Sequence, residues 1–445
     1  MEERPIQIRG RRWRVARWTA LGILLLIALA IFLIWTQRTR IASEYIEREL
    51  GRRGVRATYE VKRIGLRTQR LENLVIGDPR KPDLTARWVE VDLALGWPRT
   101  RVTLITARGV RLYGRIENGK LRMGDVDKLL PPPTGRPFRL PNQRIDVADA
   151  SMRLDTPAGR VGLAIEGKGN LAYSFNGRIA ASSRRLTPGN CVLDRPNAFV
   201  AVSTKDDQPS FRGPLRASSI ACGTLSLTQP SFALRTTLAP ALDGWRGDAG
   251  LQVPQMRVGT QRASGLAGRV SFNGDAAMTR GAMDVAAGAT AIEEFRTGRA
   301  SLDGRYAWSP RSGQLTVLGG GAARNVNASA SVAPIADALT STGGTPVEPI
   351  GDALAAAVNR FGNGFDARGN IALVNAPGSG AVRFEELVAT SRSGARLALE
   401  GREGVTYYWP AGKARINGEL ALVGGGFPAL RMSLVQPRAG SPMRG

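Results

Sequence analysis

Histidine is absent from this 445-residue sequence, and cysteine occurs only as Cys191 and Cys222. Without histidine the chain cannot carry a Ser-His-Asp triad, a histidine zinc ligand or a histidine acid–base catalyst. Two cysteines are also too few for a thiolate metal cluster. Outside the cytoplasm they either form a disulfide, which would close a loop of about 30 residues, or stay as two buried thiols. We therefore expect no cofactor, no metal site and no enzymatic activity.

Aromatic residues are scarce as well, at 6%, whereas glycine is abundant, with 53 residues. Compact β-sandwiches bury large aromatic side chains, but aliphatic residues fill the alternating positions of this sequence. The chain has 62 Lys+Arg and 37 Asp+Glu, and thus a net charge of +25. Because the arginines are scattered among acidic residues along the whole chain, we do not expect nucleic acid as a partner.

Charged residues are missing from the apolar run between Trp18 and Trp35. At about 1.5 Å per residue, a helix of this run reaches about 27 Å, which spans a bilayer core when flanking side chains extend to the interface. We predict a single transmembrane helix over residues 18–35 after a basic cytoplasmic segment over residues 1–17, because positive residues favour the cytoplasmic side. The rest of the chain is then expected outside the cytoplasm. The expected membrane-interface anchors are Arg12, Arg14, Arg17, Trp18 and Trp35.

A cleaved signal peptide is the alternative for this run, because Ala28-Leu29-Ala30 has the small residues of a cleavage site. Cleavage there would leave the apolar residues 31–35 at the new N-terminus. We therefore favour an uncleaved membrane anchor.

The apolar spacing changes along the rest of the chain. Residues 39–54 have helical spacing, which we interpret as an amphipathic helix or a helical connector, and from residue 55 the period of two predicts strands. Asn-Gly pairs between alternating runs predict hairpin turns at residues 118–119, 176–177 and 273–274. The expected segments are β-sheet over 55–130, a proline-rich loop over 131–143, β-sheet over 144–333, a linker over 334–349, a helix over 350–361, β-sheet over 362–430 and a polar tail over 431–445.

A long succession of antiparallel strands with one apolar face must hide that face, yet this sequence offers few helices to cover it. We predict a mainly β fold in which an N-terminal transmembrane helix is followed by a long curled antiparallel sheet that forms an open groove. An open aliphatic groove is tolerable only when an apolar ligand fills it, and acyl chains meet that need. The expected lining residues are Val89, Val91, Leu93, Leu95, Val102, Leu104, Val110, Leu112, Val161, Leu163, Ile165, Leu171, Tyr173 and Phe175.

Several short motifs recur in one known family. They are the Leu-x-Asn-Leu run at 71–74 leading into Gly77-Asp78, Pro82-Asp83-Leu84, Arg108-Gly109-Val110, and Gly124 leading into Leu129-Leu130. With these motifs, residues 71–130 resemble the N-terminal part of the YdbH family, in the AsmA-like superfamily of bridge-like lipid transfer proteins. Further stretches that resemble this family are residues 156–159, 393–397, 408–410 and 424–428.

The resemblance implies a periplasmic β-groove, anchored in the bacterial inner membrane, that carries phospholipids between the inner and outer membranes. It also implies a small outer-membrane lipoprotein as a partner. Members of that family that resemble this chain continue well past the segment at 424–428. We therefore expect the distal, outer-membrane end of the groove to be missing from this chain.

Two other classes of function compete with a lipid conduit. One is an anchored structural β-scaffold, either an adhesin-like solenoid, for which we find no strict repeat, or an assembly platform for outer-membrane proteins. The other is an enzyme, but Glu293-Glu294 and Glu385-Glu386 are adjacent, so on strands their carboxylates point to opposite faces. The glycine triplets at 319–321 and 424–426 lack the lysine of a phosphate loop, and we interpret both as bulges or turns.

Overall fold

The computed structural model describes residues 50–65, 67–94, 101–129, 138–292, 295–340 and 348–441. The expected transmembrane helix, its interface anchors, most of segment 39–54 and the candidate Leu95 lie outside these residues. Among the residues that are described, no helix combines the length and the apolar character needed to cross a membrane. The described chain is mainly β-sheet, and it divides into two units that are considered separately.

Unit 1 contains the described residues up to Arg115 together with 120–129 and 143–151. Its strands pair antiparallel in the order β1, β2, β3, β4, and β7 then pairs parallel to β4. This parallel pair corrects the expectation of a purely antiparallel sheet, and it arises because the long crossover between β4 and β7 returns the chain in the same direction. The elements are β1 (Ala57–Ile64), β2 (Thr68–Asp78), β3 (Lys81–Ala94), β4 (Arg101–Arg108), β5 (Arg111–Glu117), β6 (Lys120–Arg122), the 3₁₀ helix η1 (Gly124–Leu129) and β7 (Arg144–Thr156).

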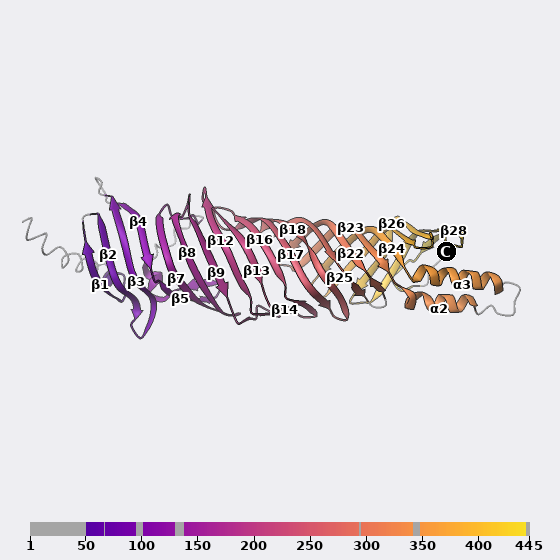
Figure 1. Ribbon diagram of the computed structural model, residues 1–445, viewed down its shortest axis with the longest axis horizontal. Helices are drawn as coiled ribbons and strands as arrows, with labels where there is room; N and C mark the ends of the chain where they lie inside the picture. Colours follow the sequence, from indigo (N-terminus) through magenta and orange to yellow (C-terminus); the bar gives the residue numbers. More distant parts are fainter. Residues whose placement is uncertain are drawn as a thin grey trace, which may run out of the picture. The chain divides into compact units, whose positions relative to one another are not determined.

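Unit 2 contains most of the remaining chain and is a succession of antiparallel strands, each hydrogen-bonded to the next (Figure 1). Its long strands are β8 (Gly159–Asn170), β9 (Asn176–Ser182), β12 (Asn197–Lys205), β13 (Gln208–Arg216), β16 (Ser231–Leu238), β17 (Gly244–Val258), β18 (Gln261–Asp275), β19 (Thr279–Ala287), β22 (Arg299–Ser309), β23 (Gln314–Val326), β24 (Phe365–Ala376), β25 (Ser379–Ser391), β26 (Arg396–Trp409), β27 (Lys413–Gly424) and β28 (Phe427–Val435). They pair in that order.

Six short strands accompany this sheet: β10 (Arg185–Leu186), β11 (Cys191–Asp194), β14 (Ser219–Cys222), β15 (Leu225–Thr228), β20 (Thr290–Ile292) and β21 (Phe295–Thr297). Four of them continue long strands beyond a shared interruption, where backbone hydrogen bonds join Ser183 N to Pro196 O at 3.0 Å and Gln229 N to Ser218 O at 2.9 Å. Arg195 and Gln229 adopt positive φ at this interruption. The interruption therefore bends several neighbouring strands at the same place.

Of the three expected Asn-Gly turns, only the first is a turn. Asn118 and Gly119 have φ of 51° and 73°, as a type I′ hairpin turn requires. Residues 176–177 and 273–274 instead lie inside β9 and β18, so those two predictions are wrong. The hairpin between β18 and β19 instead turns at Asp275. The Asp275 Oδ1 atom accepts hydrogen bonds from the backbone N–H groups of Ala277 at 2.7 Å and Met278 at 3.0 Å. An Asp-initiated turn thus replaces the Asn-Gly turn.

The expected linker at 334–349 is corrected by a helix pair between β23 and β24. Helix α2 (Ser329–Thr340) is capped by Asn327, whose Oδ1 accepts the N–H of Ser329 at 3.1 Å, and α3 (Glu348–Gly362) covers the expected helix at 350–361. The helices lie side by side (Figure 1) and bury small residues, including Ala336 and Ala357. Alanine favours a helix over a linker, which explains the correction.

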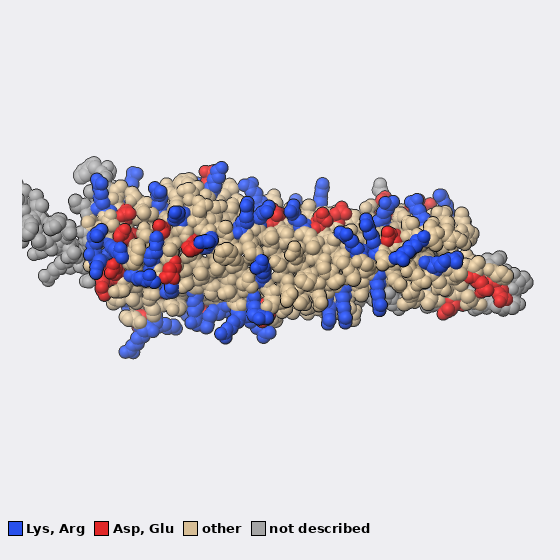
Figure 2. Space-filling model, viewed as in Figure 1, with Lys and Arg blue, Asp and Glu red and all other residues tan. Residues whose placement is uncertain are grey.

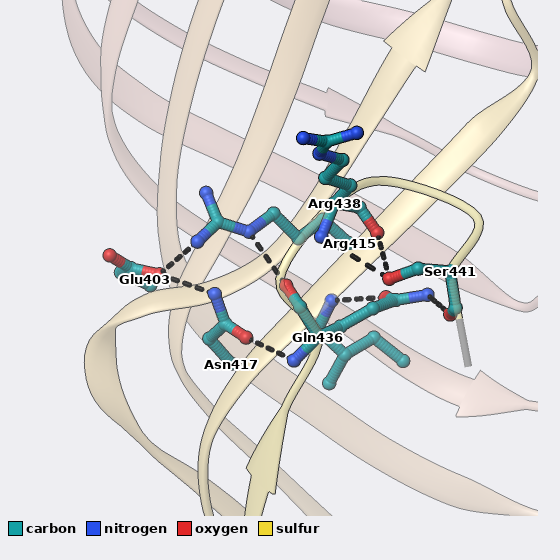
Figure 3. Close-up of polar contacts among 7 residues, drawn as sticks. Glu403, Arg415, Asn417, Gln436, Arg438 and Ser441 are labelled. Atoms are coloured by element: carbon teal, nitrogen blue, oxygen red, sulfur yellow. Dashed lines mark hydrogen bonds and ion pairs between the residues drawn. The ribbon is translucent and has the colours of Figure 1, made fainter. Parts of the chain in front are cut away.

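The predictions for the first glycine triplet and for the C-terminal tail are also corrected. Residues 319–321 pair in unbroken register within β23, so this triplet is neither a bulge nor a turn, whereas 424–426 does form the turn before β28. The tail expected at 431–445 begins as strand, because β28 runs to Val435. Gln436 then joins the end of the chain to β27 by hydrogen bonds. Its backbone N–H donates to Asn417 Oδ1 at 2.6 Å, and its Oε1 accepts from the N–H of Ile416 at 2.9 Å (Figure 3).

Candidate functional site

One face of the sheet in unit 1 is aliphatic. Residues directly opposite one another across strands share a face, and Leu71, Val89, Ala107 and Val147 form one such row across β2, β3, β4 and β7. The next row contains Val91, Ile105 and Ile145. Apart from Ala107, these side chains are half-buried rather than enclosed. Within the described residues, these rows therefore form an apolar surface that is partly exposed.

The opposite face of this sheet is charged. Trp88 lies there between two guanidinium groups, with Arg70 Cζ 4.3 Å and Arg108 Cζ 5.5 Å from its ring centroid. Arg108 also forms an ion pair of 2.8 Å with Asp146. Cation–π stacking and ion pairs of this kind suit a solvated face. Around Trp88, the two faces therefore differ in polarity.

The groove-lining residues predicted from sequence in unit 1 do not all lie on one face. Val89, Val91 and Leu93 share the aliphatic face, and Val102 lies opposite Leu93 and is 43% exposed. Leu104 lies opposite Asp92, on the face that Val91 does not share, and Leu112 lies opposite Leu84; whether either lines a groove stays a prediction. A register shift in β4 is the reason that Leu104 and Val91 lie on different faces. Val110 lies between β4 and β5, outside any strand.

Unit 2 carries a longer apolar row. Opposite residues run from Leu163 on β8 to Gly369 on β24 without a charged side chain. Its members are Leu163, Ala181, Ala198, Leu215, Phe232, Leu251, Gly268, Val285, Leu302, Gly321 and Gly369. A parallel row begins at Gly213 on β13 and continues through Val270, Ile371 and Phe384 to Ile416 on β27. We refer to these two rows together as the apolar face of unit 2.

Charged side chains of these strands lie in the intervening rows. Arg235 lies opposite Asp248, and Arg269 lies opposite Asp284, which is itself opposite Asp303. In the view of Figure 2, basic and acidic side chains are likewise interspersed over the surface rather than gathered in one patch. The alternation of apolar and charged rows indicates that only one face of this sheet is built to meet water.

The apolar face is incompletely covered. Among the described residues, Pro230 is the sole large side chain with less than 2% exposure. A cavity of about 350 Å³ opens on this face, and its lining includes Val285, Leu302, Ile371 and Phe384. Sheets of this size ordinarily bury such side chains against a second layer. Here the described chain leaves space beside them that an apolar ligand can occupy.

The short strands cover part of the apolar face. A second cavity, of about 300 Å³, is lined by Ala198 and Leu215 of the long strands and by Leu193 and Ile220 of β11 and β14. Both sets can face one cavity because the strands bend at the shared interruption. Beside these leucine and isoleucine side chains, Cys191 lies directly opposite Cys222, and the two form a disulfide with an S–S distance of 2.09 Å. The disulfide joins β11 and β14 across a separation of 31 residues.

The groove-lining residues predicted from sequence in unit 2 lie partly in β8 and partly in the turn that follows it. Val161, Leu163 and Ile165 lie on one face of β8, and Val161 lines the second cavity. Leu171 and Tyr173 are in the turn between β8 and β9, so their placement on a strand is wrong, and Tyr173 is 51% exposed. The Phe175 ring lies over Gly167 and Gly177, where a Cβ atom on either glycine would collide with it. These glycines make room for an aromatic ring on the apolar side.

Many residues of the apolar face lie beyond those predicted from sequence. Phe232, Val285 and Leu302 are examples. Val285 and Leu302 are in strands rich in alanine, glycine and serine, where alternation alone is weak. The alternating burial of β12 is the clearest missed signal, because Val200, Val202 and Thr204 are buried and their neighbours are exposed. The cross-strand pairing reveals the continuity of these residues.

One titratable group on the apolar face, Tyr306, has a shifted pKa. Burial raises the pKa of Tyr306, whose hydroxyl donates to the backbone oxygen of Ser271 at 2.9 Å. No group of three or more metal-ligating side chains occurs in the described ranges. The site is therefore an apolar surface with charged flanks.

One comparison with known proteins found a match. A family model described as YdbH-like, intermembrane phospholipid transport protein YdbH, matches residues 24–397. No curated protein and no solved structure matches the chain. The matched range includes every strand of unit 1 and the strands of unit 2 up to the start of β26.

Proposed function

This chain belongs to the YdbH-like family of intermembrane phospholipid transport proteins, and we propose that its apolar face carries the acyl chains of phospholipids from the inner towards the outer membrane of a bacterium. The observation that carries the proposal is the uncharged row from Leu163 to Gly369, which crosses strand after strand in continuous register. An acyl chain can move along such a surface without meeting a desolvated charge.

The proposed mechanism is passive. Acyl chains leave water for the aliphatic face at a gain of about 0.8 kcal/mol per buried CH₂ group, while the headgroup stays in water beyond the edge of the sheet. Because the apolar row is nearly uniform, neighbouring positions along it have similar affinity for a chain. Net direction then follows from the supply of lipid at one end and its removal at the other.

We propose that the uncharged run at residues 18–35 anchors the chain in the inner membrane, with units 1 and 2 in the periplasm. The arginines before this run support that orientation. The disulfide between Cys191 and Cys222 also supports it, because disulfides persist in the oxidising bacterial periplasm. An outer-membrane lipoprotein at the far end of the route is the partner that this proposal requires.

Photo-crosslinking in cells labelled with radioactive phosphate tests the proposal. A photoreactive amino acid is placed at Leu163 or Leu302 on the apolar face, and at the neighbouring Ala164 or Asp303 as matched controls on the other face. We expect phosphate-labelled lipid adducts at the first two positions and none at the controls. Adducts to peptide instead of lipid would favour an assembly platform. The absence of adducts at all four positions in a folded protein would refute lipid transport along this face.

A further inference from the structure

A polar cavity of about 580 Å³ lies in unit 2 and shares no lining residue with the two apolar cavities. It is formed by the ends of β15, β17 and β18 and by the short strands β20 and β21. Its lining includes Arg257, Arg262 and Arg296 together with hydroxyl side chains, among them Ser226 and Thr228. No feature of the apolar face requires a basic, hydroxyl-rich cavity at this place.

The three arginines lie in one cross-strand row. Ser226 is opposite Arg257, Arg257 is opposite Arg262, and Ala291 separates Arg262 from Arg296. Like charges directly opposite each other on antiparallel strands are destabilising. Opposed arginines also occur at Arg212–Arg235 and at Arg299–Arg324, and what distinguishes the Arg257–Arg262 pair is its place in the lining of the polar cavity.

These guanidinium groups have no acidic partner within the described ranges. None of the ion pairs or side-chain hydrogen bonds found there involves Arg257, Arg262 or Arg296, and Arg257, Arg262 and Arg296 are all exposed. Their donors are therefore available to a ligand from solution. A planar guanidinium matches the oxygen geometry of a phosphate group and can bind it through two parallel hydrogen bonds.

The row also lies at a rim of the sheet. Arg257 and Arg262 flank the hairpin turn at Gly259, and their strand neighbours Met256 and Val258 point to the opposite face. Val258 is 40% exposed and lies opposite Leu225. The rim therefore has arginines on one face and aliphatic side chains on the other, an arrangement that suits a molecule with an anionic head and apolar tails.

We infer that this cavity binds the phosphate group of a phospholipid, with Arg257 and Arg262 as the principal ligands and Ser226 and Arg296 beside them. The inference rests on the proposed function and adds a headgroup site to it. The acyl chains pass over the rim at Val258 towards the apolar side of the same strands. The cavity thus fixes a lipid by its headgroup while its chains enter or leave the apolar face.

Calorimetric titration of the purified full chain in detergent tests this site, with dihexanoyl-phosphatidylglycerol and inorganic phosphate as separate probes. The double variant Arg257→Gln/Arg262→Gln should weaken binding of the lipid by at least about tenfold, since it removes charge-assisted hydrogen bonds. The matched control, Arg280→Gln/Arg305→Gln, removes the same charge from two exposed arginines of β19 and β22 that each lie opposite an alanine. We expect it to bind the lipid as the unmodified chain does.

Three results would overturn the inference. The first is unchanged lipid binding in the Arg257/Arg262 variant. The second is an equal loss of lipid binding in the control variant, which would indicate nonspecific charge attraction. The third is binding of inorganic phosphate at least as tight as that of the lipid, which would assign the site to the free anion. Circular dichroism confirms that each variant is folded.

A third variant separates this inference from the proposed function. Leu302→Asp should lose the long-chain lipid that copurifies with the protein but keep its affinity for dihexanoyl-phosphatidylglycerol, because Leu302 lies on the apolar face and outside the arginine cavity. If Leu302→Asp loses lipid and the arginine variant binds normally, the headgroup site alone is wrong. If Leu302→Asp keeps its copurified lipid while the arginine variant loses affinity, transport along the apolar face is wrong and the anion site stands.

Discussion

Leu104 on β4 lies directly opposite Asp92 on β3, although Val102, two residues earlier, lies opposite the next residue of β3, Leu93. The extra residue is Thr103, whose hydroxyl donates to the backbone oxygen of Asp92 at 3.1 Å. A bulge of this kind reverses the faces of the residues on its two sides. Leu104 therefore shares a face with charged residues, while Val91 shares one with Ile105.

This difference predicts opposite outcomes for two similar substitutions. Val91→Asp puts a charge on the aliphatic face of unit 1 and should greatly reduce the phospholipid that copurifies with the protein, because burying an unpaired carboxylate is costly. Leu104→Asp puts the same charge on the polar face and should leave the lipid content nearly unchanged. Lipid extraction and phosphate assay of the two purified proteins give the comparison.

Equal loss of lipid in the Val91→Asp and Leu104→Asp proteins would mean that the observed register does not decide which face carries lipid. Membrane fractionation of both variants is the control, since neither substitution touches the proposed anchor. Both proteins should remain in the membrane fraction.

A pH-dependent contact in unit 1 connects η1 to Arg56, the residue before β1. Asp125 is buried and accepts hydrogen bonds from Lys128 Nζ at 2.6 Å and Arg56 Nε at 3.3 Å. The hydrogen bond from Lys128, followed by those from Arg56, holds the pKa of Asp125 below its ordinary value. Because the pKa is lowered in the folded state, the stabilisation is present above the unfolded value of about 3.9 and is lost as pH falls through the folded value.

Asp125→Asn should therefore destabilise this contact at pH 7 by roughly 1–2 kcal/mol, and the difference from the unmodified protein should vanish well below about pH 4. Hydrogen exchange of backbone amides in β1 and η1 measures the local opening free energy at each pH. The exposed Asp243 provides the control, and Asp243→Asn should change nothing. A difference that persisted at low pH would show that lost packing, rather than lost charge, explains the effect.

The disulfide is expected to hold the short strands in place. Cys191→Ser/Cys222→Ser should lower the free energy of unfolding of unit 2 by about 3 to 4 kcal/mol on the chain-entropy model for a loop of this length. It should also loosen the cavity wall that Leu193 and Ile220 contribute. Chemical denaturation with and without a reducing agent measures the free energy of unfolding of both proteins. Reductant should destabilise the unmodified protein and have no effect on the double variant.

Two reactive thiols in protein purified without reductant would contradict the disulfide. An unchanged denaturation midpoint in the double variant would instead show that the short strands are held by packing alone.

Gln436 is expected to secure the segment after β28. Its side chain is 8% exposed and its Nε2 donates to Ser441 O at 2.6 Å, while its backbone oxygen accepts from Arg415 Nε at 3.0 Å (Figure 3). Gln436→Leu keeps the size but leaves the N–H of Ile416 without its acceptor, at a local cost of about 1–3 kcal/mol. Limited proteolysis should then cut after Val435 faster than in the unmodified protein.

The exposed Arg431 on β28 is a suitable control, since Arg431→Ala removes a side chain outside this cluster. Equal cleavage rates for Gln436→Leu and the unmodified protein would show that the backbone contacts alone hold the segment.

Local patterns in the sequence were sufficient to recognise a β-rich chain of the YdbH-like family and to locate several elements. The alternation of Val89, Val91 and Leu93 depends only on neighbours along one strand, and so does the Asn118-Gly119 turn, whose two residues accept positive φ. The helix expected at 350–361 is α3, for the same reason. Each of these signals is carried by a few consecutive residues.

The tertiary structure decided which residues share a face and where the strands bend. Leu104 and Val91 lie on different faces because a single extra residue, Thr103, changes the face, and its effect is visible only through the partner strand. Asn273 and Gly274 remain in a strand because Asp275 makes the turn, and Arg195 and Gln229 mark a bend that no periodic pattern announces. Likewise, Arg257 and Arg262 become neighbours only through strand pairing. Composition and period are properties of the chain, whereas register arises from hydrogen bonds between strands, so the apolar face and its arginine rim exist only in the folded protein.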